Sequence, residues 1–390
     1  MLVIGLMSGT SADGVDACLA EVTGEGLDLA AAPRAWMTVP YPPLIRQRLF
    51  NLFREPTATL SSLSELNVQV AEAFAAAALA VCEKAGEAAD RIGCIASHGQ
   101  TICHRPPGAG EIPASWQLGE AAVIAARTGV TVVSNFRPRD MAVGGQGAPL
   151  VPFADYVLLS SPDTTRAVQN IGGVANVTYL KASGAIDDVV AFDSGPGNMM
   201  IDELAGRVTD GRLAFDEGGA LAADGAVNDE LLGELLQHEY FALPPPKSTG
   251  REAFGHFFTN ELWRGGTRRG LSPEDMLATA TALTAESIAR SYRDFLPADP
   301  PIDEVILCGG GADNPTLVRM LTDRLGGVSP RRIDDLGIPA EVKEALSFAV
   351  LGYATLQGTP NNVPAATGAA ERVVLGQITP GPATRPAEAD

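Results

Sequence analysis

Three glycine-rich turns, each directly after a short apolar run, are the segments of this sequence best suited to phosphate chemistry. They span residues 8–14, 172–173 and 309–314. Glycine lets a backbone approach a phosphate closely, and consecutive amide N–H groups form a nest for an anion. One such turn is explained as well by a simple connection between strands. Three of them in one chain favour phosphate binding.

The first turn also carries side chains that suit a phosphate and its metal ion. Thr10 and Ser11 supply hydroxyl donors, and the carboxylates of Asp13 and Asp16 could orient Mg²⁺ through water. The other common nucleotide and hydrolase motifs do not occur. Without G-x-x-x-x-G-K-[ST] the chain is not a P-loop enzyme, and without G-x-G-x-x-G or G-x-S-x-G a dinucleotide fold and a hydrolase elbow lack support.

Asp193 is the candidate for a catalytic base. It follows the apolar run 189–192 among small residues, so its carboxylate has room to face a substrate. An aspartate with an ordinary pKa of about 3.9 is ionised at neutral pH and can accept a proton. The alternative is a turn or helix-capping aspartate.

His98 and Glu344 are further candidates. His98 lies in the polar run 97–101, where it could bind a substrate or make a structural hydrogen bond. Because His98 and His104 lack the spacing of helical zinc ligands, we expect no zinc. Glu344 falls in the last predicted helix, where a solvated face is the simplest assignment.

Alternating strand and helix patterns predict an α/β fold. The runs 2–7 and 15–22 form a hairpin around the first turn, and the runs 167–171 and 174–180 form a second hairpin around Gly172 and Gly173. Two similar hairpins about a domain length apart suggest a duplicated α/β unit that faces itself across a cleft.

The other elements are predicted from apolar periodicity and caps. One helix starts near a capping box of Ser62 and Glu65 and ends at Gly86, and a later helix has Asn314 as its N-cap. The remaining predicted strands are 91–97, 130–134, 189–192 and 305–307, the remaining helices are 118–128, 271–296 and 339–356, and residues 136–152 are predicted to be a loop.

The composition predicts a cytoplasmic protein of two domains. The chain has 390 residues, 46% of them hydrophobic, and a formal net charge of −19, which disfavours nucleic acid and acidic membranes as partners. Its five cysteines are scattered without a C-x-x-C pair, as suits a reducing compartment. No basic segment suggests a signal peptide, and the longest apolar stretch, 73–82, is too short to span a bilayer.

Several segments resemble one family, the anhydro-N-acetylmuramic acid kinases of the actin/hexokinase/Hsp70 ATPase superfamily. The resemblance covers residue 1 to about residue 376. Where the family usually has Thr after the catalytic Asp this chain has Ser194, and it has Ala12 where a larger residue is common. The matching segments, in family order, are GLMSGTSADGVD at 5–16, SHGQT at 97–101, FRPRD at 136–140, GGQGAPL at 144–150, QNIGGVAN at 169–176, FDSGPGN at 192–198, CGGGADN at 308–314 and KEAL at 343–346.

The resemblance implies two actin-like, ribonuclease H-like domains that face each other across a cleft for ATP and substrate. We expect the first domain to comprise residues 1–133 with 365–390, and the second residues 134–364. ATP and Mg²⁺ would be the cofactors and a small anhydrosugar the substrate. We also expect a homodimer, with no nucleic-acid or membrane partner.

The resemblance assigns roles to individual residues. Asp193 matches the catalytic aspartate, and His98 and Glu344 match positions near the sugar. Arg137, with Arg139 as an alternative, is the candidate cation for the sugar's carboxylate. Asp13 and Asp16 would orient the metal. The residues expected to bind ATP are Gly9, Thr10, Ser11, Ala12, Asp13, Gly14, Val15, Asp16, Asn170, Gly172, Gly173, Gly309, Gly310, Gly311 and Asn314.

In the family's reaction, water attacks the anomeric carbon of 1,6-anhydro-N-acetylmuramic acid, and the released O6 takes the γ-phosphoryl of ATP. The products are N-acetylmuramic acid 6-phosphate and ADP, and the step serves peptidoglycan recycling. Two alternatives stay open. One is a kinase for another anhydrosugar such as levoglucosan, and the other is an actin-like ATPase that switches a partner protein.

Overall fold

The two predicted hairpins begin two β-sheets. The strands of the first sheet are β1 Leu2–Ser8, β2 Gly14–Glu25, β3 Asp28–Pro40, β4 Ile92–Arg105, β5 Ala114–Leu118, β6 Val132–Ser134 and β12 Gln377–Thr379. Strands β1, β2 and β3 form an antiparallel meander, and β4 and then β6 lie parallel on the other side of β1. Strands β5 and β12 extend this sheet by antiparallel pairing with β4 and β6.

The second sheet repeats this arrangement. Its strands are β7 Arg166–Ile171, β8 Val174–Leu180, β9 Val190–Pro196, β10 Glu304–Cys308 and β11 Pro330–Arg332. Strands β7, β8 and β9 form the meander, and β10 and then β11 lie parallel beside β7. Each sheet therefore has the strand order of a ribonuclease H-like domain. The predicted α/β class with two actin-like domains is confirmed.

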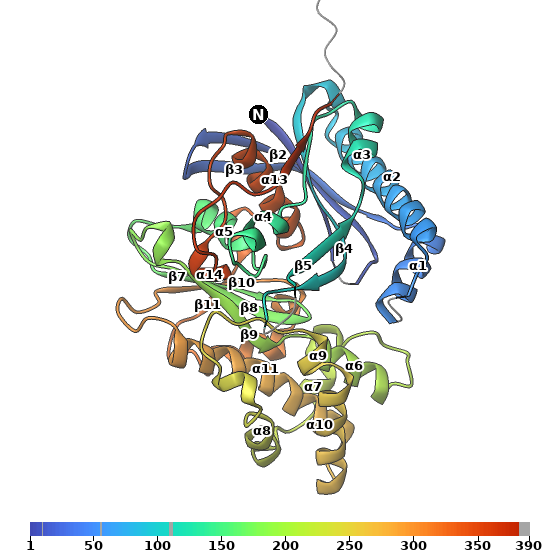
Figure 1. The fold of residues 1–390 in the computed structure, drawn as a ribbon. Helices are drawn as coiled ribbons and strands as arrows, with labels where there is room; N and C mark the ends of the chain where they lie inside the picture. The colour runs from blue at the N-terminus through green and yellow to red at the C-terminus, as the bar shows by residue number, and fades with distance from the viewer. Residues whose placement is uncertain (10, 55–56, 109–111, 382–390) are drawn as a thin grey trace, which may run out of the picture. The chain divides into compact units, whose positions relative to one another are not determined.

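The structure, a computed structural model, describes residues 1–9, 11–54, 57–108 and 112–381 (Figure 1). By its packing the chain divides into unit 1, Met1–Leu159 with Glu341–Asp390, and unit 2, Ser160–Ala340. These boundaries differ from the expected 133/134 and 364/365. The physical reason is that helices on both sides of unit 2 in the sequence, α5 (Val151–Leu159) and α13 (Lys343–Leu356), pack on each other and on the first sheet.

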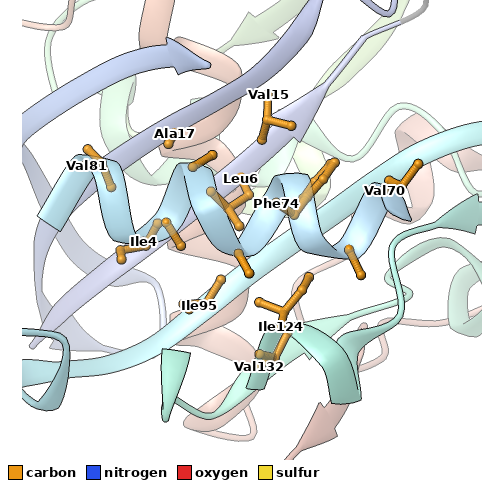
Figure 2. Packing of buried hydrophobic residues seen from close by; sticks show 14 of the residues in the cluster. Ile4, Leu6, Val15, Ala17, Val70, Phe74, Val81, Ile95, Ile124 and Val132 are labelled. Atoms are coloured by element: carbon orange, nitrogen blue, oxygen red, sulfur yellow. The ribbon is translucent and has the colours of Figure 1, made fainter. Parts of the chain in front are cut away.

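Helix α2 (Leu60–Ala85) supplies the main core of unit 1. Its buried face packs on β1, β2 and β4, with Phe74 among Leu6, Val15 and other apolar side chains (Figure 2). Thr59 caps the helix by accepting from the Ser62 amide, in place of the predicted Ser62 cap, and Gly86 ends it in the left-handed conformation as predicted. By length and composition α2 could cross a membrane, but half of its most apolar window is buried in the protein, as in a core helix.

Glycines allow α13 to lie directly on the first sheet. A Cβ on Gly5 would come within 1.8 Å of Ala345 O, and a Cβ on Gly352 within 2.4 Å of the Cβ of Ala96. Because successive residues of a strand face opposite sides, Gly5 faces α13 while its neighbours Ile4 and Leu6 face α2. The other helices of unit 1 are α1 Pro43–Arg54, α3 Ala121–Thr128, α4 Arg137–Ala142 and α14 Pro364–Thr367.

Helix α11 (Pro273–Phe295) is the central helix of unit 2. It starts with a capping box in which Ser272 and Asp275 exchange hydrogen bonds, and it packs on β9 and on the smaller helices around it. These helices are α6 Met199–Val208, α7 Ala220–Ala223, α8 Asp229–Leu235, α10 His256–Arg269 and α12 Pro315–Thr322, with α9 Arg251–Phe254 lying on α6 and α10.

Several predicted boundaries were wrong. β4 continues to Arg105 because β5, which was not predicted, pairs with its second half, so His98 lies inside a strand. The helix predicted at 118–128 begins only at Ala121, because Leu118 is the last residue of β5, and it ends at Thr128 as predicted. The expected loop at 136–152 contains α4 and the start of α5. β9 runs past Phe192 to Pro196, so Asp193 also lies within a strand.

Candidate active site

The tip of the first hairpin is held by a side chain from β4. Gln100 is fully buried, and its Nε2 donates to Gly9 O at 3.1 Å. Its Oε1 lies 2.7 Å from Ser8 Oγ, which also lies 2.7 Å from Gly14 O. Gln100 and Ser8 together tie both ends of the turn to the sheet.

Residues at the tip combine backbone strain with polar contacts. Ala12 is fully buried with φ of +43°, a conformation rare for a residue with a Cβ and concentrated at functional sites. Asp13 Oδ1 accepts from Ser11 Oγ at 2.9 Å. Val15 points into the core, so only its backbone is available to a ligand. Thr10, a predicted hydroxyl donor, lies outside the described residues.

Asp16 lies on β2 just beyond the turn. Its Oδ1 accepts from Thr38 Oγ1 at 2.6 Å. Desolvation raises the pKa of Asp16, the Thr38 hydrogen bond lowers it, and the charges of Asp13 and Glu341 raise it. Neighbouring carboxylates of this kind suit a divalent cation. Within the described ranges no three His, Cys, Asp or Glu side chains form a metal cluster. Two carboxylates alone would leave the other positions around a Mg²⁺ ion to water and phosphate oxygens, and the metal role of Asp13 and Asp16 stays a prediction.

One group of turn glycines is required by the protein's own packing. A Cβ on any of them would lie 2.2–2.5 Å from a neighbouring atom, which no real Cβ does. Gly309 also has φ of +78°, and its Cβ would meet Asn170 Oδ1. These glycines are explained without a ligand. They are Gly14, Gly197, Gly309 and Gly311.

A second group has open space where a side chain would be. A Cβ on these residues would have no neighbour closer than 3.6 Å, and none of them has a left-handed φ. Neither packing nor backbone conformation requires glycine there, and the bare backbone leaves room for the close approach of an external group. These glycines are Gly9, Gly172, Gly173 and Gly310.

Three loops of unit 2 meet at the tip of the second hairpin. The amides of Gly197 and Asn198 donate to the carbonyls of Gly173 and Gly172 at 2.9 and 2.8 Å. Asn198 Nδ2 also donates to Ile171 O at 3.4 Å, beside Gly310 and Gly311. The predicted residues of the second and third turns are thus brought together.

Asn314 caps α12, as predicted. Its Oδ1 accepts from the Leu317 amide at 2.9 Å, and Pro315 occupies the first helical position. The side chain is buried, and a Cβ on Gly219 would lie 2.1 Å from its Oδ1. This cap accounts for Asn314 structurally, and its predicted contact with ATP stays a prediction.

A β-bulge reorients β9 at Asp193. Asn176 pairs with Asp193 while the adjacent Ala175 pairs with Gly195, so Ser194 is the extra residue. Bulges often occur next to active sites, where they redirect a side chain. Ser194 is buried and its Oγ donates to Ala175 O at 3.1 Å, a role that the Thr usual in the family could also perform.

The Asp193 carboxyl is half-buried and held by backbone groups. Its Oδ2 accepts from the Thr249 amide at 2.9 Å, and its own amide donates to Lys247 O at 3.1 Å. Desolvation raises the pKa of Asp193 to about 7, against the Thr249 hydrogen bond; the charge of Glu252 raises it further and that of Lys247 lowers it. A carboxyl with a pKa near neutral is suited to general base catalysis.

In unit 1, His98 and Arg137 are brought together although 39 residues separate them. His98 Nδ1 lies 2.9 Å from Gly99 O, so this nitrogen carries the proton and Nε2 is the acceptor. Arg137 donates to that Nε2 from Nη2 at 2.8 Å and from Nε at 3.2 Å, and to Gly147 O from Nη1. Burial and the charge of Arg137 hold the pKa of His98 well below its ordinary value. The histidine is therefore neutral.

Arg137 keeps its charge beside Glu344. Desolvation lowers the pKa of Arg137 to about 10, against the charges of Glu344 and Asp140, so the guanidinium is a cation at neutral pH. Desolvation raises the pKa of Glu344, while the charges of Lys343 and Arg137 lower it. The Glu344 side chain keeps solvent-accessible surface, so its desolvation is partial, and the Arg139 side chain is exposed as well. The structure thus associates His98, Arg137 and Glu344 and gives Arg139 no part in the group.

Sequence reasoning missed three residues of these sites. Gln100 lay inside the polar run 97–101, and a buried amide in a strand next to a glycine turn was the available signal. Asn198 lay beside Gly197 in a small-residue run and could have been grouped with the glycine turns. Thr249 acts on Asp193 through its backbone amide, so its residue type gave no signal.

Comparisons with known proteins show the family to which the chain belongs. The family model described as anhydro-N-acetylmuramic acid kinase matches residues 1–381. Proteins named anhydro-N-acetylmuramic acid kinase are similar over 97% of the chain. One from Caldanaerobacter subterraneus subsp. tengcongensis is 46% identical, with 96% of it covered, and one from Salinibacter ruber is 44% identical, with 96% covered.

The solved structures to which the chain is similar are distant from it in sequence. Component A of (R)-2-hydroxyglutaryl-CoA dehydratase from Acidaminococcus fermentans is 13% identical, with a TM-score of 0.45 and coverage of 90% of this chain and 98% of that one. A ROK hexokinase from Thermus thermophilus is 15% identical, with a TM-score of 0.40 and coverage of 92% and 99%.

Proposed function

The chain belongs to the anhydro-N-acetylmuramic acid kinase family and is an enzyme of that kind, and from this premise we propose its reaction in detail. The substrates are 1,6-anhydro-N-acetylmuramic acid, water and ATP. The enzyme opens the 1,6-anhydro bridge and phosphorylates O6. The products are N-acetylmuramic acid 6-phosphate and ADP.

The proposed step has three bond changes. A water oxygen bonds to the anomeric carbon as the bond from that carbon to O6 breaks. The O6 electron pair attacks the γ-phosphorus, and the bond from that phosphorus to the bridging oxygen breaks to release ADP. Asp193 accepts the proton of the attacking water and later returns it to solvent. Atoms and charges then balance with one proton released.

Asp193 carries this proposal. It is the carboxyl in unit 2 that burial and Glu252 bring to a pKa of about 7, and a bulge and two backbone hydrogen bonds fix its direction. A base works best when its pKa lies near the working pH and its position is fixed. Both conditions are met before any ligand is bound.

The turns with open glycines are proposed to bind the nucleotide. Gly9 in unit 1 and Gly172, Gly173 and Gly310 in unit 2 leave space for phosphate or ribose against bare backbone. Asp13 and Asp16 would hold Mg²⁺, which neutralises negative charge on the transferring phosphoryl group when bound. The role of this chain's residues is to place the phosphates and exclude stray water.

Arg137 is proposed to bind the lactyl carboxylate of the sugar and so to select the muramic acid substrate. Its guanidinium is fixed by His98 and by Gly147 O, it keeps its charge, and planar guanidinium groups bind carboxylates in two-point geometry. Levoglucosan has the 1,6-anhydro bridge without that carboxylate. Glu344 is proposed to accept hydrogen bonds from sugar hydroxyls.

We further propose that the enzyme works in the cytoplasm in the recycling of cell-wall sugars. The formal net charge of −19 opposes binding to nucleic acid and to anionic membranes. A homodimer is the expected assembly, and light scattering at several concentrations tests it.

The deciding experiment is an assay with ATP, Mg²⁺ and 1,6-anhydro-N-acetylmuramic acid in ¹⁸O-labelled water, followed by mass spectrometry. The expected product is a sugar 6-phosphate with ¹⁸O on the anomeric carbon. A phosphorylated product that keeps the bridge would remove the role of Asp193 as the base for water. Faster turnover of levoglucosan would remove the assignment of Arg137, and ATP consumption without a sugar product would support a switch-like ATPase.

A further inference from the structure

The ammonium group of Lys247 is enclosed by aromatic rings in unit 2. Its Nζ lies 4.3 Å from the ring centre of Phe295, 4.8 Å from that of Tyr240 and 5.7 Å from that of Phe192. It also donates to Tyr240 O at 3.3 Å, and the residue is only 7% exposed. Cations within about 6 Å of a ring centre are attracted to it, more strongly when desolvated. This ammonium is therefore held in place.

The backbone that follows this caged ammonium holds Asp193. The Asp193 amide donates to Lys247 O, and the Thr249 amide donates to the carboxylate, at 3.1 and 2.9 Å. Tyr240, one wall of the cage, donates from its hydroxyl to Asp193 O at 2.7 Å. Phe192, another wall, directly precedes Asp193 in β9. The cage and the contacts of Asp193 are thus one continuous structure.

We propose that Lys247 is a positioning residue for Asp193, because its caged ammonium fixes the segment 247–249 whose backbone directs the Asp193 carboxylate. The proposal rests on the base role proposed for Asp193. Segment 244–250 is otherwise irregular, with α9 starting only at Arg251, so no helix or strand of its own holds it in register. The caged side chain of Lys247 anchors this segment in addition to its backbone hydrogen bonds with Asp193.

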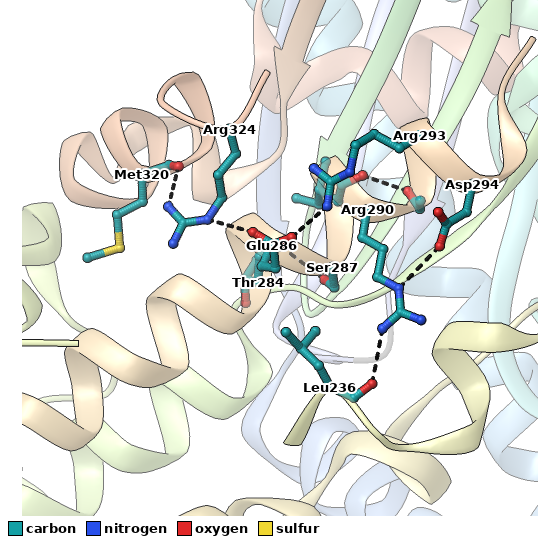
Figure 3. A network of polar contacts seen from close by, with 11 residues as sticks. Leu236, Thr284, Glu286, Ser287, Arg290, Arg293, Asp294, Met320 and Arg324 are labelled. Carbon is teal, nitrogen blue, oxygen red and sulfur yellow. Dashed lines mark hydrogen bonds and ion pairs between the residues drawn. The ribbon is translucent and has the colours of Figure 1, made fainter. Parts of the chain in front are cut away.

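Charged groups on two helices face this pair. From α11, Asp294 raises the pKa of Lys247 and Arg290 lowers it, while desolvation is the largest effect and brings that pKa to about 8. Arg290 and Asp294 pair with each other at 3.1 Å, and Arg290 also donates to Leu236 O (Figure 3). Facing Asp193 are Lys247, the Tyr240 hydroxyl and, from α9, Glu252. Lys247 and Glu252 shift the pKa of Asp193 in opposite directions.

The test compares the full-length enzyme with its Lys247→Met variant, using ATP and 1,6-anhydro-N-acetylmuramic acid over pH 5.5 to 9. We expect kcat to fall by about 10- to 100-fold, since misplacing a reacting group by about 1 Å has such an effect. The KM for ATP should change less than about twofold, because the caged segment positions Asp193 and is not proposed to contact the nucleotide. The acid limb of the pH profile, where kcat/KM rises with pH, should move to higher pH. Loss of the cation and of a fixed Thr249 amide both favour the protonated form of the Asp193 carboxyl.

Three further variants make the test specific. Lys181→Met, at an exposed lysine of the same unit, should leave the profile unchanged. Glu252→Gln should move the acid limb to lower pH, opposite to Lys247→Met. Phe295→Leu keeps the lysine but opens the nearest wall of its cage, so it should reproduce part of the Lys247→Met effect even if that variant does not fold.

Two results would overturn the proposal. If Lys247→Met and Phe295→Leu lower the melting temperature but leave the acid limb in place, Lys247 is only a stabilising residue. If Asp193→Asn keeps normal turnover, the base role fails and this inference fails with it. An inactive Asp193→Asn variant with an unshifted Lys247→Met profile removes the inference alone and leaves the proposed function standing.

Discussion

Units 1 and 2 share a strand order but hold their first turns by different means. In unit 1 the turn at 8–14 is tied down by the buried side chain of Gln100, and it carries the carboxylates of Asp13 and Asp16. In unit 2 the turn at 172–173 is held by backbone hydrogen bonds from Gly197 and Asn198 and carries no charge. Under the proposed function, the turn of unit 1 would bind metal and phosphate through side chains and backbone, whereas the turn of unit 2 would offer its backbone alone.

The two units also differ in how they bury a lysine. Lys343 of unit 1 makes an ion pair with the buried Asp155 at 2.9 Å. Lys247 of unit 2 is caged by rings, and within the described residues no carboxylate lies within 4.0 Å of its ammonium. A buried ion pair ties two side chains to each other, whereas the cage leaves the charge of Lys247 to act on the pKa of Asp193.

The largest expected effect is in unit 2, at Asp193. Asp193→Asn should lower turnover by about 10²- to 10⁴-fold, because the water loses its base. Nucleotide affinity measured by calorimetry should stay within about twofold, since Asn keeps the shape of the side chain. The exposed Asp187→Asn is the matched control. Loss of ATP binding in the Asp193 variant would assign the residue to the nucleotide and weaken the division of roles between the units.

The next effect concerns the two buried lysines. Lys343→Met should reduce the free energy of unfolding by up to about 3–5 kcal/mol, because the buried Asp155 carboxylate loses its ion pair with the ammonium. Lys247→Met should cost only about 1–2 kcal/mol, the range of a desolvated cation–π contact, because no paired carboxylate is left behind. Urea denaturation measures both.

A double variant sharpens this comparison. Asp155→Leu with Lys343→Met should recover most of the stability lost in Lys343→Met, because the buried carboxylate that lost its ion pair is removed as well. If the double variant is no more stable than Lys343→Met, the loss comes from packing, and the contrast between an ion pair and a cage does not hold.

Locally encoded features of both units could be predicted from the sequence. The two hairpins follow from glycines between apolar runs, and the ends of two helices follow from Gly86 and Asn314. Features that depend on distant partners could not. β5 is a strand only because it pairs with β4, and His98 meets Arg137 only after the sheet and α4 have formed.

The candidate site likewise combines features that the sequence predicts with features that depend on distant partners. Asp193 was predicted as the base because it follows an apolar run among small residues, where a carboxylate has room to face a substrate, and because it matches the family's catalytic aspartate. The raised pKa of Asp193, about 7, could not be predicted from the sequence, because it arises from burial and from the charge of Glu252, which lies 59 positions later. The bulge at Ser194 and the amide of Thr249 are backbone features that no residue type reports.

A smaller effect separates the two kinds of turn glycine. Gly309→Ala should destabilise the protein by about 1–3 kcal/mol, because its φ of +78° is strained for alanine and its Cβ would lie 2.5 Å from Asn170 Oδ1. Gly172→Ala should leave the melting temperature unchanged and raise the KM for ATP, since open space surrounds that position. Equal stability losses in both variants would mean that Gly172 is also a packing glycine.

The smallest effect is a pH-dependent change in stability. The pKa of Asp193 is raised from 3.8 to about 7 in the folded protein, so the fold prefers the protonated carboxyl. Ionisation of this group therefore destabilises the fold as pH rises from about 4 to about 7, and the loss stays complete above that pH. Asp193→Asn cannot ionise. Its melting temperature should match that of the unchanged protein near pH 4 and exceed it by about 2–4 °C at pH 8.

Asp16 of unit 1 gives the matched comparison for this pH effect. Its pKa is also raised, by desolvation against the Thr38 hydrogen bond and by the charges of Asp13 and Glu341. Asp16→Asn should therefore show a gain of the same sign but smaller, because the Thr38 hydrogen bond to the ionised carboxylate is weakened in the variant. Differential scanning calorimetry across this pH range measures both variants. A gain for Asp193→Asn that is the same at pH 4 and pH 8 would show that the benefit does not come from ionisation, and the proposed role of Asp193 as a base with a raised pKa would lose its thermodynamic support.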